Sequence, residues 1–376
     1  MIKQKIGKKC PEFVYFCRPN HSLETMNVYV TNLLRQGLHL IACCTIGLLG
    51  LQPLGAQTHY VFRRLNVADG LASNYVNKLA QDRTGCIWAA TEGGLSRFDG
   101  SRMQTFTAAN SDLPSDEINT VLADTLRGTL WIGTKRNGCV VMDEARQTMT
   151  LFTTDNGLVT NDVTGLSHAA DGGVWLTHYH LGVEHYRPEN GTFTPYTTEN
   201  IEGLKGTFWC AVEDKNGTLY VGSNEHGLYL IDLKSRTCRN FRHRPDEPSS
   251  LPGDQVKTVF IDRNDNVWVG TNRGLALYHP QRGDFTRFLT DTFADNSLLG
   301  NQVNDIGQST DGTLWVCTHM GGVSTLNLNN NTFRKPEEAA HRQHLPQRPA
   351  PGKGADDSCR HAFLSCRPRH ARGRSG

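Results

Sequence analysis

Hydrophobic and polar residues alternate in short runs along most of this chain, and the same order of runs recurs several times. No stretch of ten residues repeats its apolar positions with the 3.6-residue period of a helix. The turns between runs are rich in Asp, Asn and Gly. In the first unit the pattern predicts strands over Val76–Gln81, Ile87–Thr91, Leu95–Phe98 and Met103–Thr107. The pattern is therefore typical of an all-β protein.

One aromatic residue in the second predicted strand marks six copies of this unit. An apolar residue opens the first strand at the same offset before the aromatic residue in five copies, as from Val76 to Trp88. In the second copy, from Ile118 to Trp131, this offset is longer by one position. Such constancy indicates a fixed hairpin register, because a slip by one position would turn the buried side chains outward. The six frame aromatic residues are Trp88, Trp131, Trp175, Tyr220, Trp268 and Trp315.

Units of this length with four strands cannot bury their own faces, so they stack radially into a β-propeller. We predict four-stranded blades over residues 58–336, with six repeats present, which is incomplete relative to a seven-bladed ring. A β-solenoid or a two-sheet sandwich is the alternative, although solenoid repeats are shorter. The frame tryptophans lie between alternating apolar neighbours, so we expect them in the blade core. An open ring would leave blade faces and strand edges uncovered, and these could be covered by self-association or by further blades.

Two recurring motifs resemble the two-component regulator propeller repeat. One is the D-x-x-G-x-[IL]-W-[IV]-G-T-x-x-G-[GL] frame, which is seen from Asp124 to Gly138 and from Asp262 to Leu275. The other is the GL-x-x-N-x-V segment, present at residues 70–76 and 157–163. The resemblance covers about residues 60–335.

This resemblance implies the periplasmic sensor region of hybrid histidine kinase and response regulator proteins, which are common in glycan-degrading Gram-negative bacteria. In that family two seven-bladed propellers typically precede an immunoglobulin-like domain, a membrane helix, and kinase and regulator modules. The sequence given has six repeats and no kinase signature, so we do not expect it to transfer phosphoryl groups.

The two ends of the chain differ from its body. The net charge of +2 conceals a charge of +4 over residues 1–35 and of +6 over residues 339–376, which leaves −8 between them. An acidic body argues against a phosphate-tracking surface and hence against nucleic acid as a partner. The basic end of the chain has no periodicity, so we predict an irregular basic tail over 337–376, which is frameshifted or disordered. Nucleic acid or anionic lipid binding by this tail is the weaker alternative.

The apolar run from Leu38 to Leu51 resembles a secretory signal. Arg35 precedes the run, and small residues follow it near Ala56, where we expect cleavage. Residues 1–57 would then be an N-terminal extension and signal peptide, with the true start possible at Met26. A lipoprotein site at Cys43, a membrane anchor and a buried helix remain alternatives. We therefore expect a periplasmic protein, attached to the membrane only in its full-length relatives.

Cysteine and histidine give little sign of chemistry. Five cysteines fall between the predicted signal and the tail, without a CxxC pair, and we expect most to be small buried hydrophobic residues. No motif for nucleophilic, nucleotide-dependent or zinc-dependent catalysis occurs. His178 and His180 would point the same way on a strand, but no carboxylate or thiol with ligand spacing completes a metal site. We therefore predict no cofactor and no metal, and expect the cluster of His168, His178, His180 and His185 to form hydrogen bonds or face solvent.

The loops between the second and third strands are the better candidates for a site. They should lie on the same face of the ring as the loops that lead into the first strands, and they vary while their flanks stay constant. Their polar and aromatic side chains suit the hydroxyls and ring faces of carbohydrate. The candidate ligand-binding residues are Glu92, Lys135, Arg136, Asn137, His178, Tyr179, His180, Asn224, Glu225, His226, Asn272, Arg273 and His319.

These observations predict an extracellular propeller that senses a ligand, by resemblance an oligosaccharide or another small molecule, and that signals to a kinase. A propeller enzyme of the streptogramin lyase type is one alternative, supported only by the histidine cluster. A scaffold that does not signal is the other. A homodimer, or contact with missing blades, is the protein partner we expect.

Overall fold

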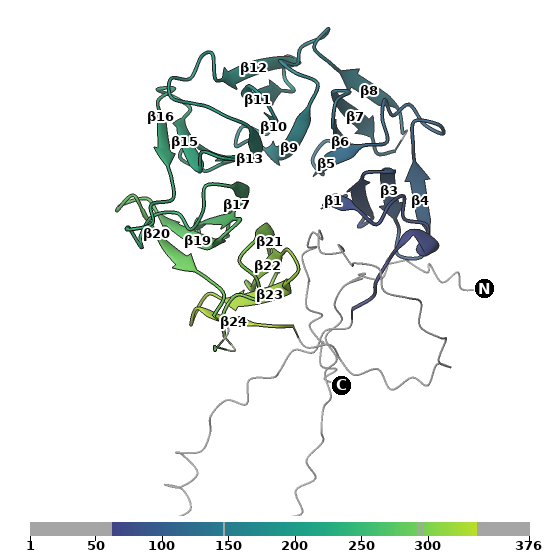
Figure 1. The fold of residues 1–376 in the computed structure, drawn as a ribbon. Helices are drawn as coiled ribbons and strands as arrows, with labels where there is room; N and C mark the ends of the chain where they lie inside the picture. The colour runs from purple at the N-terminus through teal and green to yellow at the C-terminus, as the bar shows by residue number, and fades with distance from the viewer. Residues whose placement is uncertain (1–61, 146, 292, 295, 337–376) are drawn as a thin grey trace, which may run out of the picture.

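The computed structural model describes residues 62–145, 147–291, 293–294 and 296–336. Within these residues, 24 strands form six four-stranded antiparallel sheets, and one short 3-10 helix, η1 (Val67–Asp69), precedes them. Each sheet is one blade, and the blades surround a common centre (Figure 1). The all-β propeller with six repeats is thereby confirmed. The predicted signal segment, the possible start at Met26, Cys43 and the tail from residue 337 lie outside the described residues.

Each blade consists of four strands that are consecutive in sequence. The strands of blades 1 to 3 are β1 (Val76–Gln81), β2 (Ile87–Thr91), β3 (Gly94–Phe98), β4 (Met103–Phe106), β5 (Ile118–Asp124), β6 (Thr129–Thr134), β7 (Cys139–Asp143), β8 (Met149–Phe152), β9 (Val163–His168), β10 (Val174–His178), β11 (Gly182–Arg187) and β12 (Thr192–Thr197). Those of blades 4 to 6 are β13 (Phe208–Glu213), β14 (Thr218–Ser223), β15 (Leu228–Asp232), β16 (Cys238–Phe241), β17 (Val256–Ile261), β18 (Val267–Thr271), β19 (Gly274–His279), β20 (Asp284–Phe288), β21 (Val303–Gln308), β22 (Leu314–Thr318), β23 (Gly322–Asn327) and β24 (Thr332–Arg334).

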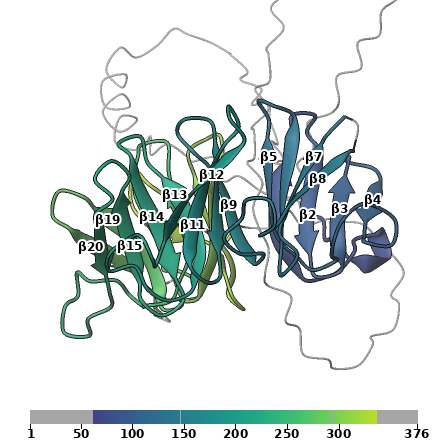
Figure 2. The ribbon, with the colours of Figure 1, turned by 90° about the horizontal axis from the view of Figure 1, so that it is seen from above.

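The first strand of every blade is innermost and the fourth is outermost (Figure 1). Seen edge-on, the strands run between the two faces of the ring (Figure 2). Successive first strands pack side by side, from β1 and β5 through to β17 and β21. The innermost strands therefore form the wall of a central channel.

The constant offset along the sequence corresponds to a constant register. The first residue of the first strand pairs with the last residue of the second strand in every blade, for example Val76 with Thr91 and Val303 with Thr318. The second unit has one residue more, and Ile118 nevertheless pairs with Thr134. Its extra residue lies in the turn between β5 and β6, where it does not disturb the pairing.

The frame tryptophans of blades 1, 2, 3 and 5 lie in the core, as predicted, and seal the interface with the next blade. Trp88 lies in one core cluster with Ile118 and Val121 of blade 2, and Trp268 lies in one with Val303 and Ile306 of blade 6. Each of these two indoles is only 1% exposed. A blade thus buries its apolar face against the next blade, because four strands alone cannot enclose it.

The Asp that recurs before the frame tryptophan also has a physical cause. In blade 5, Asp262 Oδ1 accepts hydrogen bonds from the backbone N–H groups of Asn264 and Asn266, both at 2.9 Å. Its Oδ2 accepts from Trp268 Nε1 at 2.9 Å. One buried carboxylate therefore closes the tight turn between the first two strands and satisfies the buried indole.

Glycine opens or directly precedes the third strand in all six units, and in blades 1 to 5 the backbone there approaches the fourth strand closely. At Gly94 the φ angle is +130°, and a Cβ atom would lie 2.6 Å from the carbonyl oxygen of Phe106. No L-amino acid with a side chain fits such a position without strain.

The last and first blades meet differently from the other pairs. Among the described residues, β21 and β1 do not pack side by side as the other innermost strands do. An ion pair joins them instead, with Lys78 Nζ of β1 at 3.0 Å from both carboxylate oxygens of Asp305 in β21. This pair connects residues 227 positions apart in the sequence.

The five described cysteines are all free. Cys86, Cys139 and Cys317 are buried, as expected, whereas Cys210 and Cys238 are half-buried. Burial raises the pKa of the Cys139 thiol to about 12, so it is protonated and unreactive at neutral pH.

Candidate functional site

One hydrogen bond recurs in all six blades and places the predicted loops on a single face. The first residue after the second strand donates its backbone N–H to the carbonyl of a residue just before the first strand. The donor and acceptor pairs are Glu92 and Tyr75, Lys135 and Glu117, Tyr179 and Asp162, Asn224 and Thr207, Asn272 and Gln255, and His319 and Gln302, at 2.8–3.3 Å. The face that carries these loops is called the rim below.

The predicted site residues are spread around this rim. Glu92, Lys135, Arg136, Asn137, His180, Glu225 and Arg273 are exposed, and Tyr179, Asn224, His226, Asn272 and His319 are half-buried. Most of them are far apart around the ring, and Lys135 pairs locally with Glu117 at 2.9 Å. The structure brings Tyr179 and Asn224 into one neighbourhood, described below, and the His180 ring meets Tyr179 edge to face with centroids 4.8 Å apart. Ligand binding by these residues stays a prediction.

His178 is wrongly placed by the sequence interpretation, because it is the last residue of β10 and its side chain is fully buried. Its Nε2 lies 2.8 Å from Oε2 of Glu184, which is also buried. In the other five blades this position holds Thr or Ser, whose hydroxyl donates to the carbonyl of the glycine near the start of the third strand. His178 therefore supports the turn from below and does not reach the rim.

The remaining histidines of the cluster do not converge. His185 stacks on Trp175 with ring centroids 4.5 Å apart and lies 3.0 Å from Asp171 Oδ1, while His168 and His180 are exposed. Over the described part of the chain, no group of three or more His, Cys, Asp or Glu side chains is placed to hold a metal ion.

The channel wall is built from a β-bulge that recurs in all six blades. The pairing of first and second strands shifts by one residue directly after the first residue of the first strand, as at Val76/Lys78 and Val256/Thr258. A bulge leaves one residue without a partner in the ladder and re-aims its side chain. The bulge residues of the six blades are Asn77, Asn119, Thr164, Trp209, Lys257 and Asn304.

In blades 1 to 3 the bulge residue ties its blade to the next one. Asn77 Nδ2 donates to the carbonyl of Ile118 at 2.9 Å, Asn119 Nδ2 to that of Val163 at 3.0 Å, and Thr164 Oγ1 to that of Phe208 at 2.9 Å. Each acceptor is the first residue of the next innermost strand. The hydrogen bonds of these short polar side chains thus join neighbouring blades.

In blades 4 and 5 the bulge positions hold Trp209 and Lys257. The Trp209 indole is half-buried, and its Nε1 donates to Asn224 Oδ1 at 3.1 Å. Tyr179 meets it edge to face with centroids 5.5 Å apart, and Lys257 Nζ lies 5.8 Å from its ring centroid. Gln255 Nε2 also donates to Asn224 Oδ1, at 2.6 Å. This group of five residues from blades 3 to 5 is called the Trp209 cluster.

The Trp209 cluster has fixed geometry and unused hydrogen-bonding capacity. Because Asn224 Oδ1 accepts two hydrogen bonds, the orientation of its amide is set. No hydrogen bond within the described residues uses Asn224 Nδ2, Gln255 Oε1 or the Tyr179 hydroxyl. Two donor hydrogens, one acceptor and one hydroxyl therefore surround a half-buried aromatic ring.

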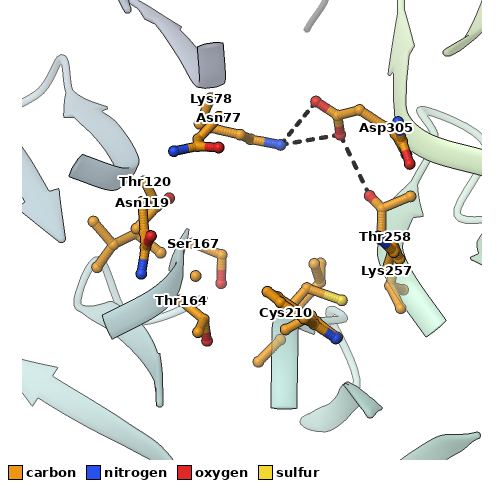
Figure 3. Close-up of a pocket in the computed structure, with 17 residues that line it drawn as sticks. Asn77, Lys78, Asn119, Thr120, Thr164, Ser167, Cys210, Lys257, Thr258 and Asp305 are labelled. Carbon is orange, nitrogen blue, oxygen red and sulfur yellow. Dashed lines mark hydrogen bonds and ion pairs between the residues drawn. The ribbon is translucent and has the colours of Figure 1, made fainter. Parts of the chain in front are cut away.

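The cluster stands beside the channel, where a cavity of about 260 Å³ is lined by all six innermost strands (Figure 3). Trp209 and Lys257 belong to its lining, together with the Lys78–Asp305 ion pair. Burial alone would lower the pKa of Lys78, but the Asp305 carboxylate raises it above its usual value. Burial raises the pKa of Cys210 to about 12. At neutral pH, Lys78 is therefore charged and the Cys210 thiol is neutral.

The sequence interpretation missed Trp209, Gln255 and Lys257 because it considered only the loops after the second strand. A signal was present, since Trp209 is the one tryptophan of six that lies outside the repeated frame. It also directly follows the residue that opens the first strand, where the other units have Asn, Thr or Lys. Glu184 was missed as well, although it lies next to the histidine cluster.

The fold and channel define this protein as a β-propeller. A family model described as the two-component regulator propeller matches residues 70–93 and 250–273, which lead into and open blades 1 and 5. These two matches, in blades 1 and 5, agree with the family that the motifs indicated.

Relatives of the chain include sensor regions of signalling proteins. The extracellular domain of a protein described as a hybrid two-component system of B. thetaiotaomicron is 31% identical, with a TM-score of 0.63, and the match covers 72% of this chain and 36% of that one. Histidine kinase P4 of Formosa agariphila is 31% identical over 88 residues, which are 23% of this chain and 6% of the kinase. The chain therefore spans about a third of the solved domain and a small part of the kinase.

A third similarity concerns the fold alone. Virginiamycin B lyase from Staphylococcus aureus has a TM-score of 0.53 at 15% identity, and the match covers 69% of this chain and 83% of the lyase. Among the described residues, no helix has the length and apolar character needed to span a bilayer. The chain thus resembles the extracellular domain of a hybrid two-component system in both sequence and fold, and a lyase in fold only.

Proposed function

We propose that this chain is the ligand-sensing propeller of an exported signalling protein, and that it binds an oligosaccharide over the channel mouth at blades 3 to 5. The similarity to extracellular domains of hybrid two-component systems supports the sensor role. Ligand occupancy would be passed to a histidine kinase, and the protein would act in the periplasm. The Trp209 cluster is the observation that carries the proposed ligand class.

Carbohydrate matches the chemistry of this cluster better than an apolar ligand does. A sugar ring has an apolar face of C–H groups that packs on an aromatic ring, and a rim of hydroxyls that both donate and accept hydrogen bonds. The Trp209 ring supplies the apolar surface, while Asn224 Nδ2 and Gln255 Oε1 supply a donor and an acceptor whose positions are set by their shared hydrogen bond. An apolar ligand would leave these polar groups desolvated and unpaired, which is costly.

The site joins neighbouring blades, which gives ligand binding a route to act on the ring. The backbone N–H of Phe208 in blade 4 donates to the carbonyl of Tyr179 in blade 3 at 3.0 Å. Gln255, which precedes blade 5, reaches Asn224 of blade 4. A ligand on this cluster therefore contacts three blades at once. If the ligand binds one relative placement of these blades more tightly than another, its binding would shift the equilibrium toward that placement.

Calorimetric titration of the whole chain with a panel of neutral and charged oligosaccharides tests the proposal. We expect saturable binding of at least one saccharide, and a loss of about fivefold to tenfold in affinity for Trp209→Ala, since one lost stacking contact is worth roughly 1–1.5 kcal/mol. Trp209→Phe keeps an aromatic face and should retain most of the affinity. Leu126→Ala, at an exposed residue in the turn between β5 and β6, is the control and should change nothing.

A scaffold without sensory function predicts a different result. It should show no saturable dependence on any saccharide, and Trp209→Ala should leave its heat of mixing unchanged. That outcome, obtained with a variant whose circular dichroism shows it folded at the temperature of the titration, would end the proposal.

A further inference from the structure

The charges that line the channel cavity point to an acidic ligand. Of the side chains in its wall, Lys78 and Lys257 are basic and Asp305 is the single carboxylate, so the net charge of the lining is +1. The body of the chain from residue 36 to residue 338 has a net charge of −8. The cavity is therefore a positively lined opening in an acidic protein, and such an opening attracts anions.

The protonation states of Cys210 and Lys78 keep the net charge of the cavity lining at +1. The Cys210 thiol faces the same cavity, and because burial raises its pKa to about 12 it adds no negative charge. Lys78 keeps its proton because Asp305 raises its pKa. The Ser167 hydroxyl also lines the cavity, is buried, and has no hydrogen-bond partner within the described residues.

The two lysines lie at different places along the same wall. Lys257 is at the bulge of β17 next to the Trp209 ring, and Lys78 is one residue past the bulge of β1, with its side chain extended toward Asp305 of β21 (Figure 3). The Lys78 side chain is 40% exposed although it is paired, and it belongs to the lining of the cavity. A sugar stacked on Trp209 would therefore place a ring substituent near one lysine and a neighbouring residue near the other.

Resting on the proposed function, we propose that the oligosaccharide is anionic, carrying a carboxylate or a sulfate, and that Lys257 and Lys78 bind this charged group in the channel mouth. Ammonium groups recognise both kinds of oxyanion by charge-assisted hydrogen bonds. Asp305 opposes the ligand because it shares Lys78 and has the same sign of charge. The wall thus contains two attractive groups and one repulsive group for the same substituent.

Three saccharides of equal length test this proposal by calorimetry on the whole chain: a galactose trimer, a galacturonic acid trimer, and a galactose trimer with one sulfate per residue. At low salt we expect at least one acidic trimer to bind about tenfold or more tighter than the neutral one, and the difference to shrink with added salt. The preferred acid identifies the oxyanion as carboxylate or sulfate.

Three variants separate ligand binding from ring stability. Lys257→Met and Lys78→Met should each weaken binding of the acidic trimer by about fivefold to tenfold and leave binding of the neutral trimer unchanged. Asp305→Asn should strengthen binding of the acidic trimer. If Lys78 and Asp305 only join the first and last blades, the two variants at this pair will instead act in the same direction, and the proposal is overturned.

The outcomes also separate this inference from the proposed function. Binding of all three trimers with equal affinity, lost in Trp209→Ala, would overturn the acidic preference and leave the sensing of oligosaccharide intact. An absence of binding by any trimer, together with no binding across the wider panel, would overturn both.

Discussion

The interfaces between blades and the wall of the channel follow opposite rules in this molecule. The interfaces repeat the same chemistry, with a buried aromatic residue such as Trp268 sealed against the next blade and, in several blades, hydrogen-bonded to an acidic side chain. The channel wall repeats the same backbone bulge but varies the side chain on it, from Asn77 to Trp209 and Lys257. Repetition therefore marks what stabilises the ring, and variation marks where a ligand can be recognised.

Exchanging tryptophan for alanine in each region should give the largest contrast. Trp268→Ala removes a fully buried indole and its bond to Asp262, and we expect a loss of about 3–5 kcal/mol in the free energy of unfolding. Trp209→Ala removes a half-buried ring with one hydrogen bond, so its cost should be about 1–2 kcal/mol. Urea denaturation followed by circular dichroism measures both. Equal losses at the two positions would contradict the distinction between the regions.

The turn carboxylates of the repeated framework should make stability depend on pH. Burial alone would raise the pKa of Asp124, but the hydrogen bonds and charge of Arg127 hold it below its usual value, with Nη1 of Arg127 at 2.8 Å from Oδ2. The stabilisation is therefore present above about pH 4, the unfolded pKa, and is lost as pH falls through the folded pKa.

Asp124→Asn should accordingly lower the free energy of unfolding at pH 7 by about 1–3 kcal/mol and reduce the further loss below pH 4. Urea midpoints recorded from pH 7 down to pH 2.5 measure this dependence. A variant whose midpoint falls with acid as steeply as that of the wild type would show that Asp124 does not contribute.

In blades 1 to 3, where the bulge residue hydrogen-bonds to the next blade, substitutions in the channel wall should lower the stability moderately. Asn119→Ala removes the hydrogen bond to the carbonyl of Val163, and we expect a loss of about 1 kcal/mol. Asn77→Ala should behave alike, because its bond to Ile118 has the same geometry. Neither change should alter saccharide binding, which calorimetry on the two variants checks. A selective loss of binding in Asn119→Ala would place the ligand at blade 2 instead of at the Trp209 cluster and Lys78.

A substitution on the exposed rim should have the smallest effect on stability and on saccharide affinity. Lys135 and Glu117 form an ion pair at 2.9 Å, with both side chains almost half exposed. Water and salt screen such a pair, and the ordering of two long side chains offsets most of the gain. Lys135→Ala should therefore leave the urea midpoint and the affinity for saccharide unchanged. A clear shift in either would show that this part of the rim is built as a site.

The elements of the fold were predictable from local pattern. The strand bounds expected for the first unit agree with β1 to β4 to within one residue at either end. The shared face of the variable loops was also predictable, because a fixed strand order places alternate connections on the same face. The burial of His178 below that face was not predictable. Whether a histidine at the end of a strand points outward or inward depends on a buried partner, here Glu184, and the spacing of residues does not reveal this partner.

The sequence by itself determined that six units of four strands bury their aromatic residues in one another, since the period, the alternation and the turn residues all repeat. Only the tertiary structure decided which side chains share the channel. Lys78 and Asp305 are 227 residues apart and meet because the chain returns to its starting point around the ring. The bulge that turns Trp209 and Lys257 toward that channel depends on pairing between strands, and a pattern read along one strand does not contain it.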